Sequence, residues 1–281
     1  MSDPLVSTEW LHERLGAPDI KIIDATWYLP GDERDPKAEY ALAHIPGAVF
    51  FDIDEIADLT SPLPHMLPPP EKFASRVKKM GLGDGSTIVV YDASGIFSAP
   101  RVWWMFRAMG HERVVVLDGG LPKWIAEGRP IEDMPPATQE RHFTPRYTSD
   151  LIRDLDQVRQ TLQSGREQVV DARAAARFTG EAPEPRPGLR GGHMPGALNV
   201  PSSTLIAPDG TMKSTEALAQ VFDAAGVDVE KPVVATCGSG ISAAIVALAL
   251  ARLGRPRTAV YDGSWTEWGG REDTPVATGA A

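Results

Sequence analysis

Cysteine is nearly absent from this sequence, since Cys237 is the single one among 281 residues. One cysteine cannot form an internal disulfide, which excludes a disulfide framework and favours a reducing compartment. Zinc sites built on two or more thiolates are excluded as well. Basic residues are also scarce, with 28 against 38 acidic residues and a net charge of −10. General attraction to nucleic acid or to an anionic membrane is therefore not expected.

Long hydrophobic runs are missing too. The most apolar stretch, residues 241–253, is shorter than the ~20 residues of a membrane-spanning helix. The N-terminus lacks a basic region followed by an apolar core, so no signal peptide is expected. No residue spacing suggests a metal site or a nucleotide-binding fingerprint, and we expect no cofactor. These absences favour a cytoplasmic protein without nucleic-acid or membrane partners.

An internal repeat is the most informative feature that is present. Four anchors recur in the same order, at offsets of 147, 149, 145 and 144 residues: Asp24–Thr26 with Asp171–Arg173, HIPGA (44–48) with HMPGA (193–197), the loop at Asp92 with the loop at Cys237, and LDGGLPKW (117–124) with YDGSWTEW (261–268). The period is too long for a solenoid and indicates two homologous domains. We expect an N-terminal domain over 1–138, a polar, proline-bearing linker over 139–149 and a C-terminal domain over 150–281.

Each half alternates strand and helix patterns. Short β-branched runs, typical of buried parallel strands, occur at 20–25, 87–92 and 113–118, and again at 168–173, 232–237 and 258–263. Helical patterns at 71–81 and 215–226 end on glycine, as helix C-termini often do. The alternation predicts an α/β fold in which each domain is an open, mainly parallel sheet with helices on both faces.

Cys237 stands where such a fold binds ligands. It ends the strand pattern PVVATC, and the glycine-rich loop GSGIS separates it from a helical pattern. Ligands of open α/β sheets bind beyond the carboxyl ends of strands. Backbone N–H groups of such a loop, together with a helix N-terminus, hold anions and favour the reactive thiolate. We therefore interpret Cys237 as a nucleophile; the alternative is a buried structural cysteine.

The first half provides an internal comparison. Its matching loop, DASGIFSA, has Asp92 in the position of the cysteine. The first domain is therefore expected to be non-catalytic, with a helix-capping or structural role for Asp92; the alternative is that Asp92 is a second catalytic group.

The tandem halves, the HIPGA and HMPGA segments, the CGSGIS loop and the closing YDGSWTEW segment resemble the two-domain rhodanese-like sulfurtransferases over nearly the whole chain. In that family, members that use thiosulfate typically carry basic residues after the cysteine, and members that use mercaptopyruvate carry a CG(S/T)G pattern. The neutral Gly238 and Ser239 are similar to the second group. The resemblance implies transfer of the sulfur of 3-mercaptopyruvate through a Cys237 persulfide to thioredoxin, a low-molecular thiol or cyanide, with release of pyruvate.

The resemblance also implies site residues. Arg177 and Arg186, in an RF…EAPEPR context, match the two arginines that hold the substrate, a task suited to bidentate guanidinium donors. The loop residues that would bind the substrate are Gly238, Ser239, Gly240, Ile241 and Ser242. The family places an aspartate and a histidine, here Asp54 and His65, beside the loop serine, here Ser239, as a proton relay. The alternatives are a helix cap for Asp54, a solvated loop residue for His65 and simple hydrogen bonding to the keto acid for Ser239.

Three other functions are alternatives to transfer of sulfur from 3-mercaptopyruvate. A thiosulfate sulfurtransferase is disfavoured by the neutral Gly238 and Ser239. A cysteine phosphatase requires an arginine at the sixth position after the cysteine, where this chain has Ala243. The retained thiol and arginines argue against a non-enzymatic sulfur carrier or binding module, and catalytic pyruvate release distinguishes an enzyme from a carrier.

Overall fold

The computed structural model describes residues 3–280 and divides into two units. Unit 1 comprises residues 3–58, Leu67–Thr148 and Pro208–Met212. Unit 2 comprises Leu59–Met66, Ser149–Ala207 and residues 213–280. Each unit therefore includes a short segment from the other half of the sequence. Both segments occupy the same place in the repeat, between the third strand of their half and the long helix that follows it.

Unit 1 is built on a five-stranded sheet in the order β1-β5-β4-β2-β3. All its strand pairs are parallel. The strands are β1 (Leu5–Val6), β2 (Ile20–Asp24), β3 (Ala48–Phe50), β4 (Thr87–Tyr91) and β5 (Val114–Leu117). The helices are α1 (Thr8–His12), α2 (Pro36–Leu42), α3 (Ile53–Ile56), α4 (Pro70–Lys79), α5 (Ala99–Ala108) and α6 (Gly120–Ala126).

Unit 2 repeats this topology, with the strand order β6-β10-β9-β7-β8 and parallel pairing throughout. The strands are β6 (Ile152–Arg153), β7 (Gln168–Asp171), β8 (Leu198–Asn199), β9 (Val233–Thr236) and β10 (Ala259–Tyr261). The helices are α7 (Leu155–Ser164), α8 (Ala175–Thr179), α9 (Thr215–Ala224), α10 (Ala243–Arg252) and α11 (Ser264–Trp268), with 3₁₀ turns η1 (Ser149–Leu151) and η2 (Ser202–Leu205). The predicted α/β fold with two parallel sheets is confirmed.

Local chemistry explains several helix ends. The Ser7 hydroxyl accepts a hydrogen bond from the backbone N–H of Trp10 and caps α1, as Ser does at helix N-termini. Gly81 and Gly226 follow α4 and α9 with φ of 75° and 73°. This left-handed conformation is nearly free of cost for glycine and ends both helices at the predicted places.

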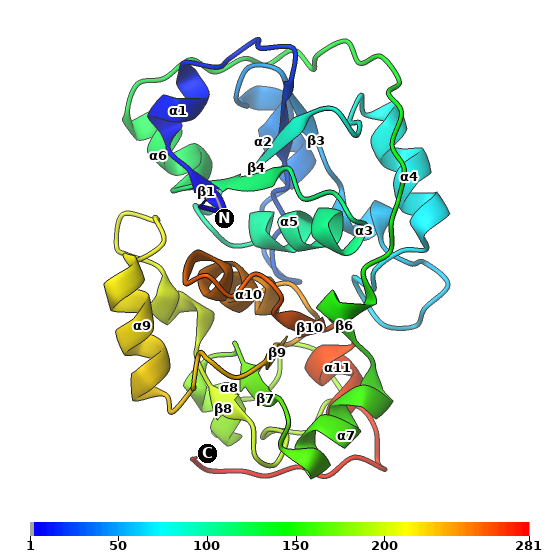
Figure 1. The fold of residues 1–281 in the computed structure, drawn as a ribbon, viewed down its shortest axis with the longest axis vertical. Coiled ribbons are helices and arrows are strands. Elements are labelled where there is room, and N and C mark those ends of the chain that lie inside the picture. The colour runs from blue at the N-terminus through cyan, green and yellow to red at the C-terminus, as the bar shows by residue number, and fades with distance from the viewer. Residues whose placement is uncertain (1–2, 281) are drawn as a thin grey trace. The chain divides into compact units, whose positions relative to one another are not determined.

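The core of each unit lies on both faces of its sheet. In unit 1, α1 and α6 contribute Leu11 and Trp124 to a cluster with Ile22 and Val89 of the sheet, and α5 packs against β4 and β5. In unit 2, α7, α8 and α11 share a buried cluster with the strands, and α10 contacts β9 and β10 on the opposite side (Figure 1). Because the helices cover the two faces of the sheet, the carboxyl ends of the strands are occupied by loops, which carry the candidate site.

The segment expected as a linker is anchored to unit 1. Phe143 is 1% exposed and packs against Phe73 and Phe106. The backbone N–H of Arg146 donates to the Met109 carbonyl at 2.8 Å.

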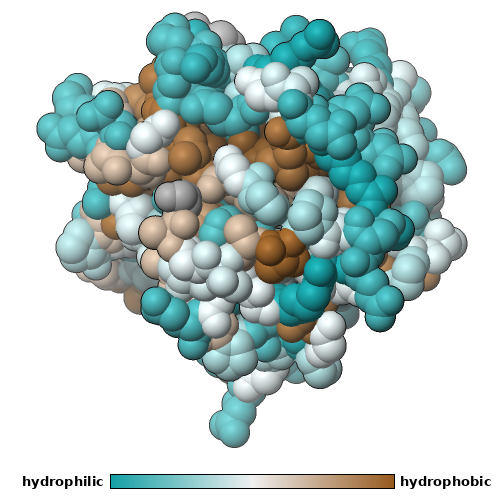
Figure 2. Space-filling view, turned by 90° about the horizontal axis from the view of Figure 1, so that it is seen from below, coloured by the Kyte–Doolittle hydropathy of each residue, from teal (hydrophilic) through white to brown (hydrophobic). Residues whose placement is uncertain are grey.

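On the face shown in Figure 2, hydrophilic side chains prevail and hydrophobic ones gather in smaller areas. No helix within residues 3–280 has the length and apolar composition that crossing a membrane requires.

Candidate active site

Cys237 follows β9 directly and begins the loop that leads into α10. Its side chain is buried, with the residue 2% exposed. Its backbone N–H donates to the Ser264 hydroxyl at 3.2 Å, and its carbonyl accepts from the N–H of Trp265 at 2.9 Å. The start of α11 therefore fixes the backbone of the cysteine on both sides.

Gly238 is held by the same helix. Its carbonyl accepts from the backbone N–H of Thr266 at 2.8 Å and from the Thr266 hydroxyl at 2.7 Å. Sequence analysis did not identify Ser264 and Thr266 as residues that hold the site. The available signal was the repeat itself, because unit 1 has Gly120 and Pro122 at these two places, without a hydroxyl at either.

The loop at Asp92 shows what this backbone geometry binds. The Asp92 carboxylate accepts four backbone N–H groups at 2.8–2.9 Å, from Ser94, Phe97, Ser98 and Ala99. Burial raises the pKa of Asp92, and these N–H groups oppose that shift. These contacts fit the expected structural role of Asp92, whose own carboxylate fills an anion cradle. The N–H groups at equivalent positions of the cysteine loop are those of Ser239, Ser242, Ala243 and Ala244.

Arg177 lies beside the cysteine loop. A Cβ atom built on Gly238 would be 3.2 Å from Nη2 of Arg177, so the guanidinium packs against the loop backbone. The Arg177 side chain is 22% exposed and hydrogen-bonds through Nη2 to the carboxylate of Glu184. A partly exposed guanidinium here can bind an anion that reaches the sulfur of Cys237.

A buried ion network stands behind Arg177. Glu184, whose side chain is 1% exposed, also accepts from Nη1 of Arg173 at 2.7 Å. Arg173 in turn binds Asp171 at 2.6 Å and stacks 4.2 Å above the Trp265 ring. Burial by itself lowers the pKa of Arg173, and the charges of Asp171 and Glu184 raise it above its ordinary value. Glu184 was missed by sequence analysis, although it stands two residues before Arg186.

Arg186 lies in the irregular segment between α8 and β8 and is partly buried. Nearby Arg190 has a different task, since it donates to the backbone carbonyls of Trp268, Gly269 and Thr274.

His65 and Ser239 come together within unit 2. Nδ1 of His65 lies 3.0 Å from Oγ of Ser239, a hydrogen bond whose direction depends on the imidazole tautomer. His65 is 6% exposed, so the alternative of a solvated residue is wrong. Its φ of 60° is uncommon for a residue other than glycine. In the repeat His65 corresponds to Gly210, which has a φ of 80° and faces Gly95 of the Asp92 loop. The imidazole is thus present beside the loop that carries the thiol.

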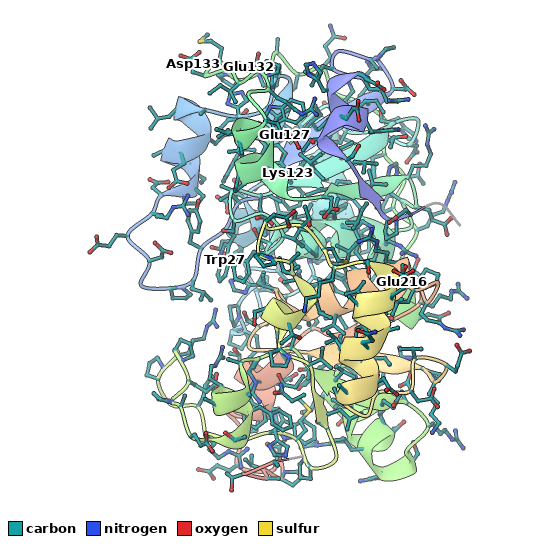
Figure 3. The ribbon with its side chains drawn as sticks, turned by 90° about the vertical axis from the view of Figure 1, so that its left-hand side faces the viewer. Trp27, Lys123, Glu127, Glu132, Asp133 and Glu216 are labelled. Atoms are coloured by element: carbon teal, nitrogen blue, oxygen red, sulfur yellow. The ribbon has the colours of Figure 1, made fainter. Side chains whose placement is uncertain are left out.

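Asp54 lies on α3 of unit 1. Its carboxylate accepts from the indole Nε1 of Trp27 at 3.0 Å; Figure 3 labels Trp27. The alternative of a helix cap is wrong for Asp54, because Asp52 is the N-cap residue and accepts the N–H of Asp54. Within the described part of the chain, no group of three or more His, Cys, Asp and Glu side chains could hold a metal ion.

Comparison with known proteins found a matching family model and similar relatives. A family model described as the rhodanese-like domain matches residues 7–127 and again residues 154–271. The 3-mercaptopyruvate sulfurtransferase of Escherichia coli (strain K12) is 46% identical over 272 residues, covering 96% of this chain and 96% of the relative. Thiosulfate/3-mercaptopyruvate sulfurtransferase 1, mitochondrial, of Arabidopsis thaliana is 43% identical over 300 residues, covering 98% of this chain and 78% of the relative.

A solved structure is also similar. The crystal structure of a 3-mercaptopyruvate sulfotransferase from Escherichia coli superimposes with a TM-score of 0.87 at 43% identity, covering 94% of this chain and 99% of that one.

Proposed function

The chain belongs to the rhodanese-like domain family, and on that premise we propose that it is a 3-mercaptopyruvate sulfurtransferase. The observation that carries the proposal is the packing of the Arg177 guanidinium against Gly238, one residue from the thiol of Cys237. A neutral loop with a single cation at its side fits a monoanionic keto acid. Arg186, from the same segment, is proposed as the second arginine that holds the substrate.

The first half-reaction forms a persulfide. The Cys237 thiolate attacks the sulfur of 3-mercaptopyruvate, a sulfur–sulfur bond forms, and the substrate carbon–sulfur bond breaks. The electron pair of that bond goes to carbon, where the adjacent ketone stabilises it as an enolate. The proton of the substrate thiol is lost from the outer sulfur, and a proton added to the enolate gives pyruvate. The reaction is therefore balanced without an added oxidant or reductant.

The backbone of the loop is suited to the persulfide anion. The cradle around Asp92 supports this step, because a carboxylate there accepts four N–H groups at the position of the cysteine. In the cysteine loop, the equivalent N–H groups of Ser239, Ser242, Ala243 and Ala244 would surround the outer sulfur. Such preorganised donors stabilise charge without reorganisation.

We assign the movement of the proton to Ser239 and His65. Their 3.0 Å contact allows the proton to pass between the substrate thiol and the enolate. The alternative, in which Ser239 only hydrogen-bonds to the bound keto acid, stays open to test. For Asp54 the support is the family resemblance alone, since the contact described above is with Trp27.

The second half-reaction returns the thiolate. A thiol acceptor or cyanide attacks the outer sulfur of the persulfide, and the Cys237 thiolate leaves. We propose thioredoxin or a low-molecular thiol as the sulfur acceptor. We also propose that the N-terminal domain, with Asp92 in the cysteine position, is non-catalytic, and that the protein is located in the cytoplasm. The support for the location is the single free thiol.

Thiosulfate is the second candidate donor. The Arabidopsis thaliana relative carries both donors in its name, and at 43% identity the donor is not decided by similarity.

Intact-protein mass after separate exposure to 3-mercaptopyruvate and thiosulfate, with pyruvate assayed alongside, tests the proposal. One added sulfur with pyruvate release, mainly from 3-mercaptopyruvate and lost in Cys237→Ser, is expected. Sulfur gained mainly from thiosulfate would reverse the choice of donor. Sulfur gained without catalytic pyruvate turnover would favour a sulfur carrier.

A further inference from the structure

Unit 1 contains a cavity of about 300 Å³ that the proposed sulfur transfer does not use. It lies at the carboxyl ends of β2 and β4, between α2 and α6. Asp24 and Thr26 are part of its lining, and Leu42, Leu121 and Ile125 contribute apolar walls. Leu42 and Ile125 are 78% and 48% exposed, so the cavity opens to solvent beside them.

The repeat shows what fills the same place in unit 2. Asp24, Thr26 and Leu121 correspond to Asp171, Arg173 and Trp265. There the Arg173 guanidinium is fully buried, binds Asp171 at 2.6 Å and stacks 4.2 Å above the Trp265 ring. Unit 1 has the shorter Thr26 and Leu121, and a cavity is present where unit 2 has a stacked guanidinium.

Unit 1 nevertheless keeps the carboxylate. Asp24 is 2% exposed, and its Oδ1 accepts from the backbone N–H of Thr26 at 2.9 Å and from its hydroxyl at 2.5 Å. Cations around the cavity bind other carboxylates. Arg34 donates to both oxygens of Glu39 at 2.7 Å. Lys123 of α6 lies 2.6 Å from Glu127, and both are labelled in Figure 3. The cavity thus combines apolar walls with an acid whose counterpart in unit 2 binds a guanidinium.

We propose that this cavity is a binding site for a guanidinium group, carried by a small molecule or by an arginine of a peptide. The group enters beside Leu42 and Ile125, stacks against Leu121 and donates hydrogen bonds to Asp24. A carboxylate has about four acceptor positions, so Asp24 can add a planar donor to the contacts it makes with Thr26 and Tyr91. A planar, delocalised cation is also less costly to desolvate than an ammonium group.

Binding through Asp24 depends on pH. Burial raises the pKa of Asp24 to about 6, hydrogen bonds from Thr26 and Tyr91 oppose the shift, and the charge of Asp92 adds to it. The other titratable groups that line the cavity are Arg34, Glu39 and Tyr40, from α2 and the segment before it; Lys123 follows the lining residue Pro122 on α6. Because only ionised Asp24 pairs with a cation, affinity rises about tenfold between pH 5 and pH 7.

Calorimetric titration of the full chain tests this site. The probes are methylguanidine and an acetylated Gly-Arg-Gly amide, with methylammonium and the Gly-Lys-Gly counterpart as controls. The variants are Asp24→Asn, which removes the charge, and Thr26→Arg, which introduces the side chain that fills this place in unit 2. Neither residue belongs to the sulfurtransfer site, so pyruvate release from 3-mercaptopyruvate serves as the check of folding. The outcome of the binding test does not depend on whether 3-mercaptopyruvate or thiosulfate is the sulfur donor.

The site is supported if the wild type binds either guanidinium probe at pH 7, and if binding is weaker by about tenfold or more in both variants and in the wild type at pH 5. Tighter binding of the peptide assigns it to peptide-borne arginine, and tighter binding of methylguanidine assigns it to small guanidino compounds. The proposal is overturned if neither probe binds the wild type, if the ammonium controls bind equally well, or if folded Thr26→Arg binds as the wild type does.

Discussion

Replacing Glu184 by glutamine changes the charge behind Arg177 while keeping the size of the side chain. Glu184 is buried and accepts from both Arg173 and Arg177. The substitution removes one negative charge from a network of two guanidinium groups and two carboxylates. Breaking a buried ion pair costs about 3 kcal/mol of unfolding free energy, and we expect this loss in chemical denaturation.

The change in donor preference follows from the charges of the donors. Removing a charge about 6 Å from a bound donor, at an effective dielectric constant near 20, changes the binding energy by about 3 kcal/mol per unit of donor charge. Because Arg177 is 22% exposed, about half of that is a reasonable allowance for solvent screening. Thiosulfate carries one more negative charge than the keto acid. The ratio of kcat/KM for thiosulfate to that for 3-mercaptopyruvate should therefore rise about tenfold.

The assay is initial-rate kinetics with both donors and a fixed acceptor. Glu181→Gln is the matched control, since Glu181 is an exposed carboxylate of the same segment and undergoes the same change of charge. An unchanged donor ratio in Glu184→Gln would refute the reasoning. An equal shift in Glu181→Gln would show that overall charge, rather than the pair with Arg177, sets the preference.

Four further outcomes are expected. Asp92→Ala leaves four N–H groups, two of them buried, without their acceptor and should lower the unfolding free energy by about 3 kcal/mol in urea denaturation; an unchanged midpoint would contradict the cradle. Gly238→Ala places a methyl group 3.2 Å from Arg177 and should raise KM for 3-mercaptopyruvate severalfold with little change in Tm. His65→Ala and Ser239→Ala should each slow single-turnover pyruvate release by about 10²-fold, and the double variant should be no slower, as for a single relay. Because the native pKa of Asp24, about 6, exceeds its ordinary value of 3.8, ionisation destabilises the fold by up to about 3 kcal/mol as pH rises from 4 to above 6. Asp24→Asn should remove that loss, so Tm of the variant relative to wild type should increase between pH 4 and pH 7.

Features that depend on local pattern could be predicted from the sequence. The β-branched runs at 87–92 and 232–237 lie in the middle of their sheets as β4 and β9, which are buried on both faces and so lack polar alternation. The position of Cys237, after a buried strand and before a glycine loop, could also be predicted from the neighbouring residues alone. Strands β1 and β6 have two residues each, too few for any periodicity to reveal them.

Features that depend on long-range packing could not be predicted. Ser264 reaches the backbone of Cys237 from 27 residues away, and nothing in the spacing indicates that contact. Glu184 was passed over because a carboxylate between prolines is usually a solvated residue, and its burial depends on Arg173 and Arg177. Asp52 and Asp54 both suit the start of α3, and the extended backbone at Asp52, with φ of −76° and ψ of 103°, decides which one caps it.

The segments that the two sequence halves exchange bear on how such a chain evolves. Residues 59–66 come from the half that has no thiol, yet they are part of unit 2 and bring His65 to the loop of Cys237. Residues 208–212 are part of unit 1 in return. Deleting either half of the sequence would therefore remove a piece of the unit built mainly from the other half. The half without a thiol therefore supplies part of the unit that carries one, and neither half of the sequence by itself contains a whole unit.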